Sequence, residues 1–184
     1  MSNLIVKNTL IPGCFELQTD LFKDQRGSFV KIFNEKSFKE HQLETQYKEE
    51  YYTISRQGVL RGLHFQIPPE HCTKIVRCLV GGVLDAIVDL RIGSPAYGKF
   101  QSFKLNSDDN NMLYLPPGIA HGFYVMSEKA LMLYKVSREY APEHDKGIRW
   151  DSLGIPWPSK SPIVSERDQK FPSFANFVSP FEYK

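Results

Sequence analysis

The 184-residue sequence predicts an all-β fold, a double-stranded jelly roll with a few short helices. Short segments rich in β-branched and aromatic residues recur from residue 51 to residue 136, as is typical of strands. Turn signals such as Gly81-Gly82 and Pro116-Pro117-Gly118 separate these segments. Short strands at this spacing, with no helical pattern between them, favour a sandwich or barrel over a βαβ fold.

The first fifty residues predict three elements. An N-terminal arm of two strands spans residues 1–22, a charged turn leads into a third strand over residues 24–33, and a helix spans residues 35–46. The arm turns at Pro12-Gly13, a combination that is common in turns. The helix is expected to be amphipathic and about three turns long, because Phe38 and Leu43 stand among charged and polar neighbours without a proline.

The jelly-roll core is expected to span about residues 23–140, within a single domain of residues 1–184. A C-terminal segment of about residues 141–184 is too aromatic for a disordered linker, so we expect it to cover the barrel and to form one or two short helical turns. The clearest core strands are predicted at residues 58–66, 74–80, 83–91, 99–105, 111–115, 121–125 and 130–136.

Charge and composition exclude several classes of function. The chain carries 23 Lys and Arg against 21 Asp and Glu, so no nucleic-acid footprint is indicated. No apolar run approaches the roughly 20 residues of a membrane span, and the N-terminus lacks a signal-peptide layout. The three cysteines (Cys14, Cys72 and Cys78) have no zinc-finger spacing. We therefore expect reduced thiols in a cytoplasmic protein that binds neither nucleic acid nor membrane.

The segment Gly58–Gln66 combines an apolar strand pattern with two chemically active side chains, Arg61 and His64. Side chains alternate along a strand, so these two are expected on opposite faces of the sheet. A bulge at Gly62 would change that arrangement, because glycine inside a strand often marks a bulge or a close backbone approach.

Two segments resemble the half-motifs of the cupin jelly roll: Gly58 followed by His64, and the run from Pro116 to His121. In metal-binding cupins the first half-motif continues with a second histidine two residues later, where this chain has Gln66. An amide oxygen is a poor substitute for an imidazole nitrogen at a transition metal. We therefore expect no metal and no cofactor, and acid–base chemistry in their place.

Seven motifs follow one another along the chain as in one enzyme family: Asp24-Gln25-Arg26-Gly27-Ser28-Phe29, Gly58–Gln66, Lys74-Ile75-Val76-Arg77, Asp85–Arg91 with Ser94-Pro95, Pro117–Phe123, Tyr134 with Tyr140-Ala141-Pro142-Glu143, and Ser165-Glu166-Arg167-Asp168. In these motifs the chain resembles the dTDP-4-dehydrorhamnose 3,5-epimerase family. The resemblance implies a metal-free epimerase that acts on nucleotide-diphosphate 4-keto-6-deoxy sugars. It also implies a homodimer in which the subunits exchange an N-terminal strand.

The resemblance further implies a role for each matched side chain. His64 matches the base, Asp168 the carboxylate paired with it, Lys74 the stabiliser of the enolate oxygen, and Tyr134 the proton donor. Taken singly, these four residues would be read as a core histidine, a cap, a strand-edge charge and a packing residue. The remaining matches imply substrate contacts: Arg61 for pyrophosphate, Arg26 and Phe29 for the nucleotide, and His121 and Tyr140 in the site.

The sequence departs from the family where the dTDP enzymes recognise thymine. Lys31 replaces a usual glutamate, and Glu49-Glu50-Tyr51 replaces a Gln-Asp-Asn run. A carboxylate such as Glu49 can accept from the adjacent donors of guanine, which thymine lacks. We therefore expect Lys31, Glu49 and Tyr51 in the binding site and a GDP-linked sugar in preference to a dTDP- or CDP-linked one.

The sequence leaves the outcome of the reaction open. Family members that act at C3 alone keep the same His, Lys and Tyr. Two outcomes therefore stay open, inversion at C3 only and inversion at both C3 and C5. A nucleotide-sugar 3,4-ketoisomerase is a further alternative, disfavoured by Gln66, because those relatives typically carry a second histidine there. A non-catalytic nucleotide-sugar-binding cupin is the alternative from another class. It is disfavoured because binding alone needs no base or proton donor.

Overall fold

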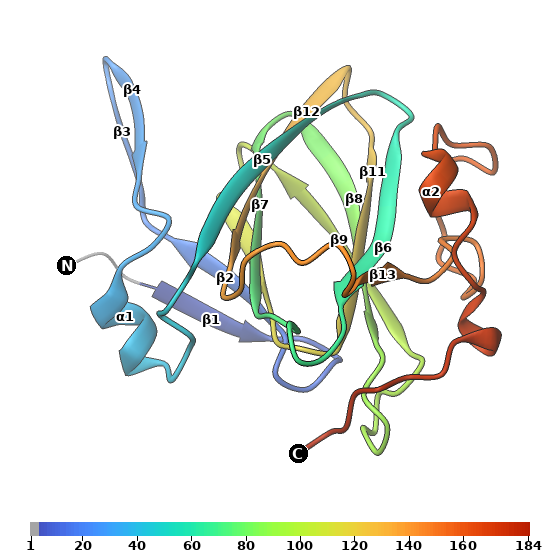
Figure 1. The fold of residues 1–184 in the computed structure, drawn as a ribbon. Helices are drawn as coiled ribbons and strands as arrows, with labels where there is room; N and C mark the ends of the chain where they lie inside the picture. The colour runs from blue at the N-terminus through green and yellow to red at the C-terminus, as the bar shows by residue number, and fades with distance from the viewer. Residues whose placement is uncertain (1–3) are drawn as a thin grey trace.

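The structure, a computed structural model that describes residues 4–184, confirms the all-β prediction (Figure 1). Two antiparallel sheets face each other as a jelly roll. The first sheet has six strands in the order β1 (Leu4–Asn8), β2 (Phe15–Thr19), β10 (Asn111–Leu115), β7 (Lys74–Val80), β12 (Lys129–Val136) and β5 (Glu49–Arg56). The second has five, in the order β13 (Asp145–Gly147), β6 (Leu60–Gln66), β11 (Ile119–Val125), β8 (Gly82–Asp89) and β9 (Phe100–Asn106).

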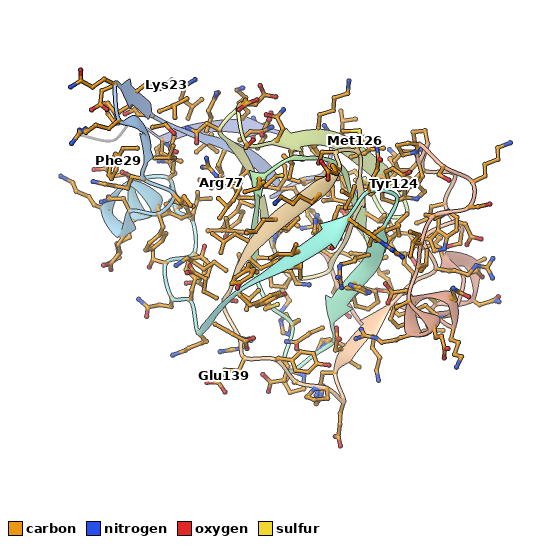
Figure 2. All side chains as sticks on the ribbon, turned by 90° about the horizontal axis from the view of Figure 1, so that it is seen from above. Lys23, Phe29, Arg77, Tyr124, Met126 and Glu139 are labelled. Atoms are coloured by element: carbon orange, nitrogen blue, oxygen red, sulfur yellow. The ribbon has the colours of Figure 1, made fainter. Side chains whose placement is uncertain are left out.

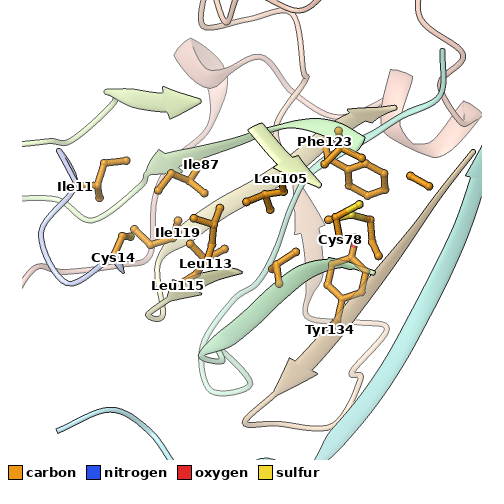
Figure 3. Close-up of a cluster of buried hydrophobic side chains, with 14 of the residues drawn as sticks. Ile11, Cys14, Cys78, Ile87, Leu105, Leu113, Leu115, Ile119, Phe123 and Tyr134 are labelled. Carbon is orange, nitrogen blue, oxygen red and sulfur yellow. The ribbon is translucent and has the colours of Figure 1, made fainter. Parts of the chain in front are cut away.

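The main core lies between the two sheets and is built from alternate residues of both (Figure 3). Val76 and Leu113 come from the first sheet, and Ile87, Leu105 and Phe123 come from the second. Burying each such side chain contributes about 1.5–3 kcal/mol, and a shift of register by one residue would turn the whole set out of this core. The strong alternation therefore fixes which side chains point into the barrel, including those of the site described below.

A two-stranded hairpin of β3 (Leu21–Asp24) and β4 (Gly27–Val30) projects away from the barrel (Figure 1). Its aromatic side chains, Phe22 and Phe29, are exposed, and their ring centroids lie 6.4 Å apart. Two apolar rings on a hairpin that packs against neither sheet leave apolar surface in water.

The predicted helix over residues 35–46 is about half as long as expected: α1 spans Glu35–Glu40. It begins at Asn34, whose side chain accepts from the Ser37 N–H (3.1 Å), an ordinary N-cap. It ends because Gln42 adopts the left-handed conformation and the Leu43 N–H bonds the Phe38 carbonyl (3.0 Å), a helix-stop geometry with an apolar contact between Phe38 and Leu43. Leu43 belongs to the helix stop, so the apolar spacing that predicted three turns was misread.

The C-terminal segment packs on the outer face of the five-stranded sheet, where it carries α2 (Glu166–Gln169) and the 3-10 turn η1 (Phe174–Asn176) (Figure 1). Phe65 of β6 stacks edge-on against Phe177 and Phe181, and Ile148 is buried in the same cluster. This packing brings the C-terminal segment beside β6, and with it the α2 helix.

The three cysteines, Cys14, Cys72 and Cys78, are unpaired and buried. Burial raises the pKa of the Cys14 thiol to about 12, so this thiol stays protonated and unreactive. Among residues 4–184, no helix has the length and apolar character needed to cross a membrane.

Candidate active site

A bulge in β6 places Arg61 and His64 on one cavity. His121 of β11 lies opposite His64 and Phe123 lies opposite Arg61, so three steps along β6 correspond to two along β11. The extra residue is accommodated at Gly62, whose φ of 139° favours glycine. A Cβ on Gly62 would lie 2.6 Å from the Cα of Gly122, so two glycines are needed where the strands approach. The bulge that was raised as a condition is present, so the expectation that Arg61 and His64 lie on opposite faces is wrong, and both side chains line an inner cavity of about 140 Å³.

His64 is held by a carboxylate from the C-terminal segment. Its Nε2 lies 2.9 Å from Oδ1 of Asp168 in α2, and Oδ2 of Asp168 accepts the Gly62 N–H (3.1 Å). Burial acts to raise the pKa of Asp168, but the hydrogen bonds from His64 and Gly62 outweigh it, and the net pKa lies below the ordinary value. The carboxylate therefore stays ionised, fixes the ring, and leaves Nδ1 as the nitrogen that can act as a base.

Lys74 places a cation beside this base. It is the first residue of β7, its side chain is half-buried, and its Nζ lies 3.5 Å from the carbonyl oxygen of His64. Lys74 and His64 line both the inner cavity and a larger, adjoining cavity of about 300 Å³. An ammonium fixed in a partly dry cavity stabilises negative charge that develops on a bound oxygen.

Tyr134 of β12 supplies a phenol to the inner cavity from the opposite sheet. Its ring stacks on Tyr51 of the neighbouring strand β5, with centroids 4.8 Å apart and planes inclined by 14°. Burial raises the pKa of the Tyr134 phenol well above its ordinary value, and nearby Tyr51 and Asp85 add to the shift. The phenol therefore stays protonated, as a proton donor must before it acts. Figure 3 shows Tyr134 at one end of the buried core cluster.

A second histidine and carboxylate face the same cavity. His121 Nε2 lies 2.7 Å from Oδ2 of Asp85, and both residues are buried in the barrel. Burial raises the pKa of Asp85, although the adjacent His121 opposes the shift. The His121 ring lies edge-on to Tyr134 at 6.1 Å between centroids. The sequence placed His121 in the site but did not single out Asp85, although a carboxylate inside the apolar run Val83–Val88 was a visible signal.

The larger cavity is lined by three of the predicted substrate contacts, Glu49, Tyr51 and Tyr140, beside Gln66. The Tyr140 N–H donates to Oε2 of Glu49 (2.7 Å), so this carboxylate is engaged with the protein's own backbone. Within residues 4–184 no cluster of three or more His, Cys, Asp or Glu side chains is arranged to hold a metal ion.

The hairpin residues lie apart from this cavity. Arg26 pairs with Asp24 at 2.6 Å and its side chain is 85% exposed, while Phe29 and Lys31 are also exposed. Figure 2 shows Phe29 on the projecting hairpin, well away from Glu139 at the rim of the larger cavity. One chain therefore assembles the predicted catalytic residues but leaves Arg26, Phe29 and Lys31, the predicted nucleotide contacts of the hairpin region, outside the cavity.

The fold and the cavity define the class of protein: a jelly-roll enzyme whose oriented imidazole, ammonium and phenol are suited to moving protons at carbon. The family-specific sequence pattern described as dTDP-4-dehydrorhamnose 3,5-epimerase matches residues 8–176. The chain belongs to this family and is an isomerase.

Individual relatives agree with the family assignment. The chain is 37% identical over 179 residues to the dTDP-4-dehydrorhamnose 3,5-epimerase of Shigella flexneri, covering 94% of this chain and 99% of that protein. A Legionella pneumophila 3,5-epimerase, solved in complex with dTDP-4-keto-L-rhamnose, superposes with a TM-score of 0.93 at 30% identity, covering 99% and 100% of the two chains. A 3'-monoepimerase from Streptomyces bikiniensis, in complex with dTDP-quinovose, gives 0.87 at 29% identity, covering 92% and 87%.

The GDP-linked sugar expected from the sequence finds no support in these relatives, which are named for dTDP sugars or were solved with them. The argument for GDP depended on a free Glu49 carboxylate that could read guanine. In the structure that carboxylate accepts the Tyr140 N–H and lines the cavity of His64 and Lys74. The glutamate at position 49, one part of the departure from the thymine motif, therefore has a local structural explanation.

Proposed function

We propose that the protein inverts C3 and C5 of a dTDP-linked 4-keto-6-deoxy sugar. The observation that carries the proposal is the convergence of the His64–Asp168 pair, Lys74 and Tyr134 on one inner cavity. The named activity of the relatives, and the dTDP sugars held by two of them, support the substrate class. A product of this kind belongs to the formation of deoxysugars and surface polysaccharides.

The proposed reaction uses each of these groups once for each carbon. The C4 ketone acidifies the C–H bonds at C3 and C5, and Nδ1 of His64 takes the proton. The electron pair moves into an enolate whose oxygen is stabilised by Lys74. The Tyr134 phenol then gives a proton to the opposite face of the carbon, which inverts the centre. Asp168 stabilises the imidazolium formed in the first step.

The proposed binding contacts surround this centre. Arg61 donates its Nε to Ser55 Oγ (2.9 Å), which leaves the rest of the guanidinium for the pyrophosphate. His121 and Tyr51 border the sugar in the inner cavity, and Glu49 and Tyr140 border it at the rim.

The exposed hairpin supports a homodimer as part of the proposal. Arg26, Phe29 and Lys31 lie too far from the cavity of their own chain to contact its ligand, so we assign them to the nucleotide in the site of a second copy. Exchange of the N-terminal strand is the proposed means of holding the two copies together. Residues 1–3 of the predicted N-terminal arm lie outside the described part of the chain. We further propose one domain over residues 1–184 and a cytoplasmic location, which the three unpaired cysteines support.

The proposal is tested by incubating the protein in D2O with a dTDP-linked 4-keto-6-deoxy sugar and following the C3 and C5 proton signals by NMR. Loss of both signals is expected. Loss at C3 alone would make the protein a 3-epimerase, like the Streptomyces relative. Exchange with a GDP-linked sugar only would support the hypothesis that the protein recognises guanine. Movement of the keto group from C4 to C3 would indicate a ketoisomerase. Nucleotide binding without exchange would indicate a non-catalytic binder.

A further inference from the structure

The Gln66 side chain joins β6 to the rim of the active-site cavity. Gln66 ends β6, two residues after His64, and is 7% exposed. Its Nε2 donates to the carbonyls of Glu70 (2.7 Å) and Glu139 (3.3 Å), and its Oε1 accepts the Ala141 N–H (2.7 Å). One carboxamide therefore holds the backbone on both sides of Tyr140.

Further hydrogen bonds complete the fixation of this rim segment, residues 139–141. The Tyr140 N–H itself donates to Oε2 of Glu49 on β5 (2.7 Å). The Ala141 carbonyl accepts from the N–H groups of His144 and Asp145, each at 2.9 Å, at the start of β13. In contrast, the Tyr140 residue is 57% exposed and lines the mouth of the larger cavity. The backbone of the rim segment is held, while the Tyr140 side chain remains free to meet a ligand.

Only an amide fits these contacts at position 66. A carboxylate would have no proton for the Glu70 and Glu139 carbonyls, and a methionine has no donor and only a weak sulfur acceptor. A buried carbonyl or N–H that loses its partner destabilises the segment that carries it, so either substitution should release the rim segment. Gln66 stands where metal-binding cupins carry their second histidine. In this chain the side chain at that position binds backbone groups of the rim segment and of Glu70.

We propose that Gln66, assisted by Glu49, is a positioning residue that fixes the rim segment and thereby sets the relative rates at which C3 and C5 are presented to His64. The inference rests on the proposed epimerase function. With the ketone oxygen at Lys74, C3 and C5 lie on either side of C4, and turning the ring about the C4–O bond exchanges their positions. A wall held at a fixed place beside His64 and Lys74 restricts that rotation, because both residues line the same cavity as Tyr140.

The test uses the full-length variants Gln66→Met and Gln66→Glu, with Gln57→Met as the matched control. Gln57 also donates its Nε2 to a carbonyl, that of Met126 (2.9 Å), but it lies in an exposed turn outside the cavity. The first measurement, on the protein alone, is backbone hydrogen exchange of the rim segment. Both Gln66 variants should exchange about fivefold faster or more there, the change that loss of one ordinary hydrogen bond produces. Unchanged protection would overturn the proposed fixation, whatever the protein catalyses.

The second measurement is the ratio of deuterium entry at C3 to that at C5 with the dTDP-linked sugar, together with kcat and KM. In Gln66→Met the ratio should change by about fivefold or more and KM should rise, while Gln57→Met matches the wild type. A ratio unchanged in both Gln66 variants, even with lower activity or thermal stability, would reduce Gln66 to a structural residue. If the wild type itself exchanges neither carbon, the proposed function fails and the positioning role fails with it, while the exchange data still report the backbone contact.

Discussion

Two histidine–carboxylate pairs face one cavity, and they differ in origin and exposure. His64 lies on β6, its side chain is 29% exposed, and Asp168 reaches it from a helix 104 residues further along the chain. His121 and Asp85 lie on adjacent barrel strands, with side chains that are 5% and 0% exposed. His64 is thus accessible to a ligand, and its carboxylate partner comes from a segment outside the barrel. Both members of the second pair are buried within the barrel itself.

The two carboxylates also differ in the direction of their pKa shifts. For Asp168, hydrogen bonds from His64 and Gly62 outweigh burial and lower the pKa, whereas burial raises the pKa of Asp85. One oxygen of Asp85, Oδ1, is buried without a hydrogen-bond partner, but both oxygens of Asp168 are bonded. The same residue types thus make an ionised, orienting pair in one place and a costly buried pair in the other.

The largest expected difference is between the two histidines. His64→Asn should lower kcat by about 10³-fold or more, because general bases contribute up to about 10⁴-fold, whereas His121→Asn should lower it by about 10–100-fold. The affinity for dTDP, measured by calorimetry, should change little in either variant. Equal losses of kcat in the two variants would show that both rings act as bases and would remove the distinction.

Asp168 should have the next largest effect. Asp168→Asn keeps the size of the side chain but removes the charge that stabilises the His64 imidazolium, and kcat should fall by about 100-fold or more with little change in KM. Asp151→Asn is the control, because Asp151 also pairs with a basic group, Arg149, in the exposed part of the C-terminal segment. Comparable losses in the two variants would mean that the segment as a whole, and not its carboxylate at His64, supports activity.

Asp85→Asn should have a smaller effect on rate. Its partner His121 borders the sugar but is not assigned the proton transfer, so kcat should fall by about tenfold, the lower part of the range for acid–base residues. Steady-state kinetics at pH 7 measure this directly. A fall as large as that of Asp168→Asn would make the buried pair an equal contributor to proton transfer.

The two pairs also differ in how far the sequence could predict them. The strands of the barrel followed from β-branched runs between turn signals, and Gly62 marked the bulge beside His64. That bulge also needs Gly122, which lies in another strand. The sequence could therefore say only that Arg61 would change face if a bulge formed at Gly62. The contact of His64 with Asp168 spans 104 residues and no local pattern encodes it, so only the resemblance to a family supplied it.

The environments of two side chains could not be read from the sequence because their partners are distant in sequence. Asp85 lies within the apolar run Val83–Val88 and was given no role, but the fold pairs it with His121, 36 residues further along the chain. Glu49 was read as a nucleotide contact, although its partner is the backbone of Tyr140, 91 residues away. In both cases the environment of the carboxylate is a property of the fold.

The smallest expected effect of these substitutions is on the pH dependence of the free energy of unfolding. This effect separates the two pairs most clearly, because the two carboxylates should act in opposite directions. The folded-state pKa of Asp168 is lowered, so its contribution is present above the ordinary carboxyl value of about 3.9 and is lost as pH falls through the folded value. The folded-state pKa of Asp85 is raised, so its contribution is complete below about 3.9 and is lost as pH rises through the folded value.

The thermal unfolding of Asp168→Asn and Asp85→Asn, measured from pH 3 to pH 7, should therefore diverge from the wild type in opposite senses. Relative to the wild type, Asp168→Asn should lose stability as pH rises from 3, and Asp85→Asn should gain it. Each kcal/mol corresponds to about 2–4 °C in Tm for a chain of this size. Parallel curves would mean that the two carboxylates share one electrostatic environment. In that case the difference in burial between the pairs would have no consequence for their charge.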